Sequence, residues 1–130
     1  MKSIVAIIVF NLLFINISFS QGQVELNDIA HEEYYQSQNS KDSLVSELMI
    51  LRSEDEDFKK TFELAEKHWN EFVDIQFVLK FPSFESWETR RQVYGSSFDM
   101  CYYQFLKTYC DLRITAIFDL FVSEGDVCGE

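Results

Sequence analysis

The sequence contains very little of the residues that end regular secondary structure, with one proline and four glycines in 130 residues. An all-β sandwich requires frequent turns, which are built largely from these residues, so the composition argues against this class. The chain also lacks the motifs of common enzymes, such as a nucleophile elbow or a glycine-rich loop that cradles phosphate. We therefore expect an all-α protein with no catalytic residues and no enzymatic activity.

Histidine is equally scarce, and neither His31 nor His68 stands at a metal-ligand spacing from a cysteine. We therefore predict no metal site and no cofactor. Four consecutive acidic residues, Glu54 to Asp57, resemble paired carboxylates for acid–base chemistry. Acidic residues at the start of a helix more often cap it and compensate its dipole, and we favour that interpretation.

Basic residues are few, with 11 Lys and Arg against 22 Asp and Glu, and the formal net charge is −11. Lys2 is the only charged residue among the first 20, so residues 21–130 carry 10 basic and 22 acidic side chains, a net charge of −12. Such a charge repels nucleic acid and anionic lipid and favours a basic partner. Solubility alone is an equally good explanation of the same charge.

The N-terminus has the layout of a secretory signal peptide. Met1–Ser3 is short and positive, Ile4–Ile17 is apolar, and Ser18–Ser20 places small residues at the −3 and −1 positions of a cleavage site. An uncleaved membrane anchor is the alternative, but asparagines at 11 and 16 interrupt a run already too short to span well. We expect residues 1–20 to be removed from a secreted or periplasmic protein that has no membrane span after cleavage.

The remaining residues, 21–130, are predicted to form a single helical domain, since no repeat, low-complexity tract or linker divides them. Hydrophobic periodicity predicts a small bundle built on a long antiparallel helix pair, at about 54–80 and 97–122. Shorter N-terminal helices are expected at Val24–Tyr35 and from Asp42 onward, separated by a polar break at 36–41.

The helix at 97–122 is apolar over roughly 200° of its circumference, against the roughly 100° stripe of an ordinary surface helix. It must therefore be covered on two sides, and we predict that it is the central helix. Arg113 lies inside the apolar arc and needs a partner there.

The helix at 54–80 has the clearest periodicity in the chain. Its apolar seam advances by four and three residues in turn, and we place in it Phe58, Phe62, Ala65, Trp69, Phe72 and Gln76. Ser53–Glu56 is expected to cap its start. Phe81-Pro82 ends it, because a residue before proline is driven out of helical geometry. A short helical turn is expected at Glu85–Gln92.

The three cysteines allow one intramolecular pairing within geometric reach. Cys101 and Cys110 lie about 13–14 Å apart along one helix, beyond the roughly 7 Å that a disulfide permits. From the end of this helix the extended chain to Cys128 spans roughly 25 Å, which reaches Cys110, about 16–17 Å back, but not Cys101. A Cys110–Cys128 disulfide fits an exported protein. The alternatives are that all three thiols are free or that one pairs between chains.

A set of spaced residues between Asp42 and Ile117 resembles the lysozyme inhibitor LprI-like family of small exported helical domains. The matching positions are Ala65-Glu66-Lys67-His68-Trp69, Phe72, Asp74, Gly95-Ser96, Arg113 and Ile117. Upstream, Asp42, Val45, Ser46 and Met49 match the family pattern only loosely. Val73 and Cys110 replace the arginine and the threonine of the family pattern.

The two cysteine positions of the family pattern fall on Phe77 and Phe105, so the family disulfide is absent here. Two positions close enough for a disulfide are also close enough for a contact between two phenylalanines. Such a contact makes the two long helices antiparallel, with paired positions that sum to 182, and places Trp69 level with Arg113. Stacking on the indole is worth about 0.5–2 kcal/mol, and Glu66 is positioned to accept hydrogen bonds from the guanidinium. We expect a structural role for this group of residues.

The resemblance implies a non-enzymatic exported protein that binds or inhibits a cationic, lysozyme-like cell-wall hydrolase. Our candidates for contact with this partner are Glu54, Asp55, Glu56 and Asp57, together with the loop that carries Trp87. The alternative is a structural or interaction module of the cell envelope with no hydrolase partner. A small hydrolase is disfavoured because the chain has no catalytic constellation.

Overall fold

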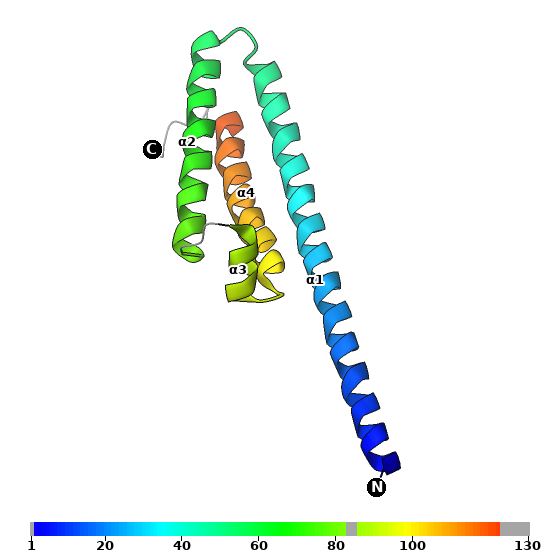
Figure 1. Ribbon diagram of the computed structural model, residues 1–130. Helices are drawn as coiled ribbons and strands as arrows, with labels where there is room; N and C mark the ends of the chain where they lie inside the picture. Colours follow the sequence, from blue (N-terminus) through cyan, green and yellow to red (C-terminus); the bar gives the residue numbers. More distant parts are fainter. Residues whose placement is uncertain (1, 83–85, 123–130) are drawn as a thin grey trace, which may run out of the picture.

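The computed structural model describes the backbone of residues 2–82 and 86–122, and the side chains of residues 21–82, 86 and 88–121. Four helices make up the described backbone: α1 (Lys2–Leu51), α2 (Glu56–Lys80), α3 (Trp87–Tyr94) and α4 (Phe98–Val122). These ranges contain no β-strand, so the predicted all-α fold is confirmed. Figure 1 shows the three long helices side by side, with the short α3 near the start of α4.

Helix α4 is the central element, as predicted. On one side it runs parallel to α1, because Asn27 pairs with Ser96 and Ser37 with Asp111, 69 and 74 residues further along the chain. On its other side it runs antiparallel to α2, where Glu66 pairs with Arg113 and Phe77 with Phe105. The predicted antiparallel pair is therefore present, and α4 lies between α1 and α2 (Figure 1).

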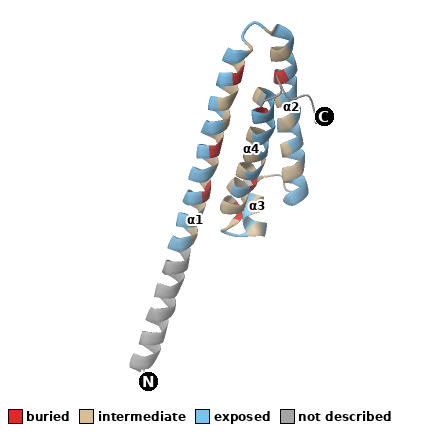
Figure 2. Cartoon of the chain, turned by 180° about the vertical axis from the view of Figure 1, so that it is seen from behind, coloured by how far each residue is buried: buried red, intermediate tan, exposed pale blue. Residues whose placement is uncertain are grey.

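The two interfaces of α4 differ in spacing. The backbones of α1 and α4 approach most closely, and α1 contributes the small buried residues Ala30 and Ser37 to this interface. Figure 2 shows the buried positions of α1 on the side that faces α4. The α2–α4 interface is filled instead by aromatic rings, such as Phe77 and Phe105, which hold the two backbones further apart. Side-chain size thus sets the distance between each pair of helices.

The prediction of two shorter N-terminal helices is wrong, because α1 continues without a break through residues 36–41. Ser37 is buried against α4 and donates a hydrogen bond of 2.5 Å to the Asp111 carboxylate. Ser40 bonds to the Gln36 carbonyl within the helix. Packing and hydrogen bonds to α4 therefore override the weak helix propensity of this polar segment. Asp42 caps no helix; its carbonyl accepts a bond from Ser46.

Six of the buried residues form two clusters at opposite ends of α4. Leu48, Phe62 and Ile117 join α1, α2 and α4 near the α1–α2 turn. The second cluster lies around Phe98 and joins the end of α2 to α4, and its other buried members are Phe81 and Phe105. The covered side of α4 is narrower than its apolar arc, since Leu112, which belongs to that arc, is 52% exposed.

The ends of the helices are fixed by specific caps. Asp55, not Ser53, caps α2, since its carboxylate accepts from the Phe58 N–H at 2.9 Å. Helix α2 ends at Lys80, before the Phe81–Pro82 pair, as predicted. The short helix expected at Glu85–Gln92 is present as α3, two residues further along. It ends at Gly95, whose φ of 82° is a conformation that favours glycine.

A polar cluster links α1 to α4 through Asp111. Its carboxylate accepts hydrogen bonds from Ser37 and, at 2.7 Å, from the ammonium group of Lys107. Partial burial acts to raise the pKa of Asp111, but these two hydrogen bonds and the charge of Lys107 outweigh it, so the pKa lies below its usual value. The hydrogen bond to Asp111 also raises the pKa of Lys107.

We expect the Asp111 cluster to make the stability of the folded protein depend on pH in the acid range. Because the folded pKa of Asp111 is depressed, its contribution is complete above the unfolded pKa, near 3.9, and is lost as pH falls through the folded pKa. Asp111→Asn should therefore lower the melting temperature at neutral pH. Between about pH 5 and about pH 2 the melting temperature of this variant should fall by less than that of the wild type. Thermal unfolding followed by circular dichroism tests this, with the exposed Asp119→Asn as control. An acid profile of Asp111→Asn that matches wild type would contradict the assignment.

Candidate functional site

The predicted acidic segment covers the end of the turn between α1 and α2 and the first two residues of α2. Glu54, Glu56 and Asp57 are exposed there, while Asp55 is half-buried. A surface hollow of about 590 Å³ is lined by these four residues together with Leu51 and Arg52. The turn therefore presents a group of carboxylates at one end of the bundle.

The four carboxylates of the turn are not equivalent. Asp55 caps α2 and lies 3.8 Å from the guanidinium of Arg52, which itself stacks over the Phe58 ring. Glu56 pairs with Lys59, one turn further along α2, at 2.8 Å. Asp55 thus serves the helix start, and Glu54, Glu56 and Asp57 are the carboxylates that the turn offers to a partner.

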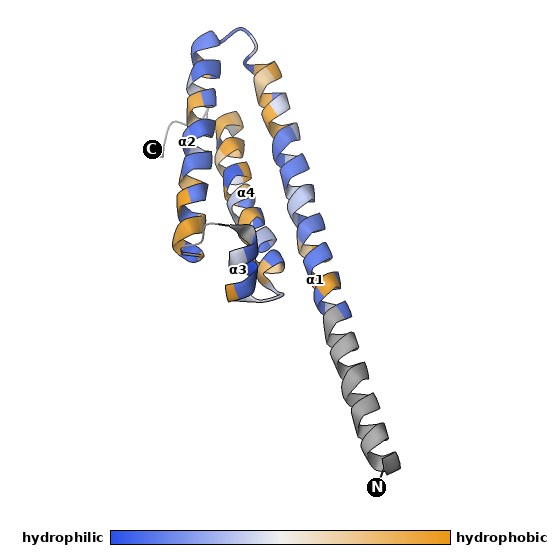
Figure 3. Cartoon of the chain, in the orientation of Figure 1, coloured by the Kyte–Doolittle hydropathy of each residue, from blue (hydrophilic) through white to orange (hydrophobic). Residues whose placement is uncertain are grey.

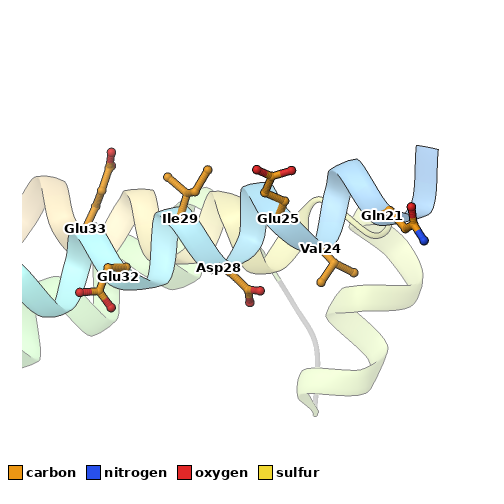
Figure 4. Close-up of a pocket in the computed structure, with 7 residues that line it drawn as sticks. All are labelled: Gln21, Val24, Glu25, Asp28, Ile29, Glu32 and Glu33. Atoms are coloured by element: carbon orange, nitrogen blue, oxygen red, sulfur yellow. The ribbon is translucent and has the colours of Figure 1, made fainter. Parts of the chain in front are cut away.

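A second acidic surface, which sequence reasoning missed, follows the described N-terminal part of α1. A hollow of about 680 Å³ there is lined by Gln21, Val24, Glu25, Asp28, Ile29, Glu32 and Glu33, all from this one helix. In Figure 4, Glu25 and Glu33 point to one side of α1 and Asp28 to the other. The surface is therefore an open helix face, without walls to enclose a small ligand. It carries four carboxylates, so we use it below as a comparison for the turn.

Trp69, Glu66 and Arg113 form the group that the family resemblance predicted. The Arg113 guanidinium lies 5.4 Å from the centre of the Trp69 ring and donates from Nε to Glu66 at 2.6 Å. The Arg113 side chain is 12% exposed. The predicted partners of Arg113 are confirmed, and Phe62 is an additional one, with its ring centre at 5.7 Å. The positive charge is matched within the bundle, so this group is a structural link between α2 and α4.

Phe77 and Phe105 make the predicted contact, with ring centres 5.7 Å apart. Phe77 also lies against Tyr102 and Phe81, each at 5.3 Å, and the guanidinium of Arg90 lies over its ring at 4.7 Å. An aromatic cluster therefore occupies the positions where the family pattern has its two cysteines.

The remaining residues of the predicted pattern lie at the edge of the bundle or in a turn. Ala65 and Asp74 are exposed, and Phe72 is 44% exposed beside Tyr109. The predicted seam is therefore right at Phe58, Phe62, Trp69 and Gln76, which are not exposed. Glu66 and Val73 take the places expected for Ala65 and Phe72. Gly95 ends α3, and the Ser96 carbonyl accepts a hydrogen bond from Asn27 of α1.

A small pocket of about 220 Å³ lies where α1, α2 and α4 meet. Tyr34 and Lys41 of α1 line it together with Asn70 and Asp74 of α2, and its apolar lining includes Cys110. Burial, followed by the nearby Cys110 and Tyr102 side chains, raises the pKa of Tyr34. The polar groups of this pocket include no pairing of a nucleophile with a histidine base.

Only some of the residues in the cysteine and tryptophan predictions have side chains that the structure describes. Cys110 is buried and Cys101 half-buried, and both thiols are free among the described residues. Cys128 lies outside the described residues, so the Cys110–Cys128 disulfide stays a prediction. Trp87 is the first residue of α3, but its side chain also lies outside the described part, and its contact with a partner stays a prediction.

Neither a metal centre nor a membrane span is found in the described ranges. Within them, no three His, Cys, Asp or Glu side chains come together in a way that would hold a metal ion. Likewise, no helix in this part of the chain is both long enough and apolar enough to cross a membrane. Comparisons with protein-family models, with curated proteins and with solved structures found no match.

Proposed function

We propose that the chain is an exported, non-enzymatic binding protein, similar to the lysozyme inhibitor LprI-like family, which binds a cationic cell-wall hydrolase. The α1–α2 turn would make the contact through Glu54, Glu56 and Asp57. The single observation that carries the proposal is the exposure of these three carboxylates at one end of an acidic bundle. Carboxylates on such a surface attract a basic partner and speed its association.

The other polar groups that interact within the bundle hold its helices together, and this also supports a binding role for the exposed carboxylates. Arg113 and Glu66 pair with each other between α2 and α4. Lys107, Asp111 and Ser37 pair between α1 and α4. Because these groups hold the helices together, the exposed carboxylates are the best candidates for contact with another protein.

A direct binding measurement tests this proposal. The protein purified from cells that express the full chain is titrated with hen-type lysozyme, a strongly basic hydrolase, by isothermal calorimetry at low and high salt. We expect binding at low salt that weakens by at least about tenfold between about 0.05 and about 0.5 M salt, because salt screens exposed charges. Binding that is absent, or equally tight at both salt concentrations, would sink the proposal.

Two matched variants locate the contact surface. Glu54→Gln, Glu56→Gln and Asp57→Asn together remove three charges from the turn and leave the Asp55 cap in place. Glu25→Gln, Asp28→Asn and Glu32→Gln remove three charges from the acidic face of α1. We expect the turn variant to weaken binding by at least about tenfold and the α1 variant by less than about threefold. Equal losses would show that net charge, not the turn, determines binding.

The alternative is a structural or interaction module of the envelope with no hydrolase partner. One observation favours it: large apolar side chains on α2, Ile75 and Leu79 among them, are exposed to solvent. Under this alternative lysozyme binding is absent at every salt concentration.

A further inference from the structure

Helix α2 exposes an apolar stripe that mostly faces away from α4, with Phe72 at its edge beside Tyr109 of α4. Its members, with their exposed fractions, are Leu64 (54%), Phe72 (44%), Ile75 (60%), Val78 (50%) and Leu79 (68%). Figure 3 shows the hydrophobic colour gathering in the last turns of α2. We call these five residues the α2 stripe.

Helical geometry separates the α2 stripe from the side that packs on α4. At 100° per residue, Leu64 points about 200° and Ile75 about 220° away from Phe62, which is 6% exposed and packs in the core. The aromatic core explains the apolar residues on the inner side of α2 but not those of the stripe. A surface helix ordinarily carries polar residues on its outer side.

We propose that the α2 stripe binds the same stripe of a second copy of this chain, with the two α2 helices antiparallel. Because each contact then occurs twice about a two-fold axis, one surface serves both copies and the assembly closes as a dimer.

The area of the stripe fits a homodimer. From the exposed fractions, and with about 200 Å² for a complete large apolar side chain, the five residues expose about 500 Å². A standard stable interface buries about 800 Å² per partner, and about 65% of a homodimer interface is apolar. The stripe therefore supplies the apolar part of such an interface, and the polar residues beside it supply the rest.

The charges beside the stripe also favour a second copy over a basic protein. Charged residues of alternating sign follow this part of α2 in the order Lys60, Glu63, Lys67 and Glu71. Lys67 and Glu71 form an ion pair at 3.9 Å. A surface with both signs complements itself in an antiparallel pair. The α1–α2 turn, in contrast, presents mainly carboxylates. The two surfaces therefore select different partners, and the dimer does not depend on the proposed function.

Sedimentation equilibrium tests the dimer directly. The protein purified from cells that express the full chain is examined from about 1 to about 200 μM, a range that brackets micromolar association. We expect a concentration-dependent dimer. Ile75→Glu should weaken it by at least about thirtyfold, because each dimer would bury two additional charges without partners. The matched control is Ile50→Glu, which changes an isoleucine of α1 that is 75% exposed and distant from the stripe in sequence.

The outcomes separate the alternatives. Circular dichroism spectra of the two variants that match wild type show that the fold is retained. A wild-type protein that is monomeric throughout the range would overturn the proposal, as would an Ile75→Glu variant that dimerises like wild type or an Ile50→Glu variant that does not dimerise. Salt should strengthen the dimer, since it screens the repulsion between two acidic copies, whereas it weakens lysozyme binding. Failure of one proposal is therefore distinguishable from failure of the other.

Discussion

Trp69→Ala is expected to reduce the free energy of unfolding by about 3–5 kcal/mol. The indole fills the centre of the α2–α4 interface, where it contacts Phe72 and Tyr109 at ring-centre distances of 5.7 and 6.5 Å. Its removal leaves a cavity and also takes away the ring under the Arg113 guanidinium. Chemical denaturation with urea measures the change.

Arg113→Met is the matched comparison, and we expect it to cost much less, about 1 kcal/mol, because the carboxylate left behind is in contact with water. Methionine fills a similar volume against Trp69, and Glu66, whose side chain is 23% exposed, can be hydrated when it loses its partner. If Trp69→Ala left the melting temperature unmoved, or if Arg113→Met cost as much, the aromatic packing would not be what holds α2 to α4.

Leu48→Ala is expected to have the second large effect, a loss of about 2–5 kcal/mol. Leu48 is 1% exposed and packs with Phe62 and Ile117, so it is the most deeply buried residue that α1 contributes to the cluster near the turn. The control is Ile50→Ala, two residues further along the same helix. Because Ile50 is 75% exposed, this change should alter stability by less than about 0.5 kcal/mol.

The pair of variants at positions 48 and 50 tests how α1 is placed. Equal losses for the two, or a loss at position 48 below about 1 kcal/mol, would contradict the packing of α1 on α4 in this register. Urea denaturation of both variants in parallel provides the comparison, since the slope against urea should stay unchanged if only stability differs.

The register of α2 on α4 was predicted from the family resemblance, because the two cysteine positions of the family pattern fall on Phe77 and Phe105. One contact, Phe77 with Phe105, fixes the register of two straight helices, and the position of Arg113 against Trp69 and Glu66 follows from it. The seam of α2 was harder to place. Phe72 and Ala65 fit the same periodicity as Val73 and Glu66. A glutamate on the inner side of a helix can be predicted only once its arginine partner is known.

The continuity of α1 was missed although the sequence contains a signal for it. Residues 30, 34, 37, 41, 44 and 48 advance by four and three in turn, and none of them is exposed. Ser37 and Lys41 interrupt the hydrophobic pattern, so the segment looked like a polar break. Ser37 is buried because Asp111 of α4 accepts its hydrogen bond. That partner lies 74 residues away, and local periodicity cannot supply it.

The candidate site was predictable in composition but not in detail. Net charge pointed to a basic partner, but it cannot distinguish the turn from the acidic face of α1, which carries Glu25, Asp28, Glu32 and Glu33. Nor does a run of four acids show which of them caps the helix. The structure assigns that role to Asp55, which leaves its neighbours exposed.

The initial rate of cell-wall lysis by hen-type lysozyme, measured with increasing amounts of the purified protein, tests the proposed function most directly. At low salt we expect lysis to slow in proportion to the protein added, and the variant with Glu54, Glu56 and Asp57 neutralised to slow it far less. An unchanged rate of lysis at a large molar excess of wild-type protein would contradict the proposal that this chain binds and inhibits such a hydrolase.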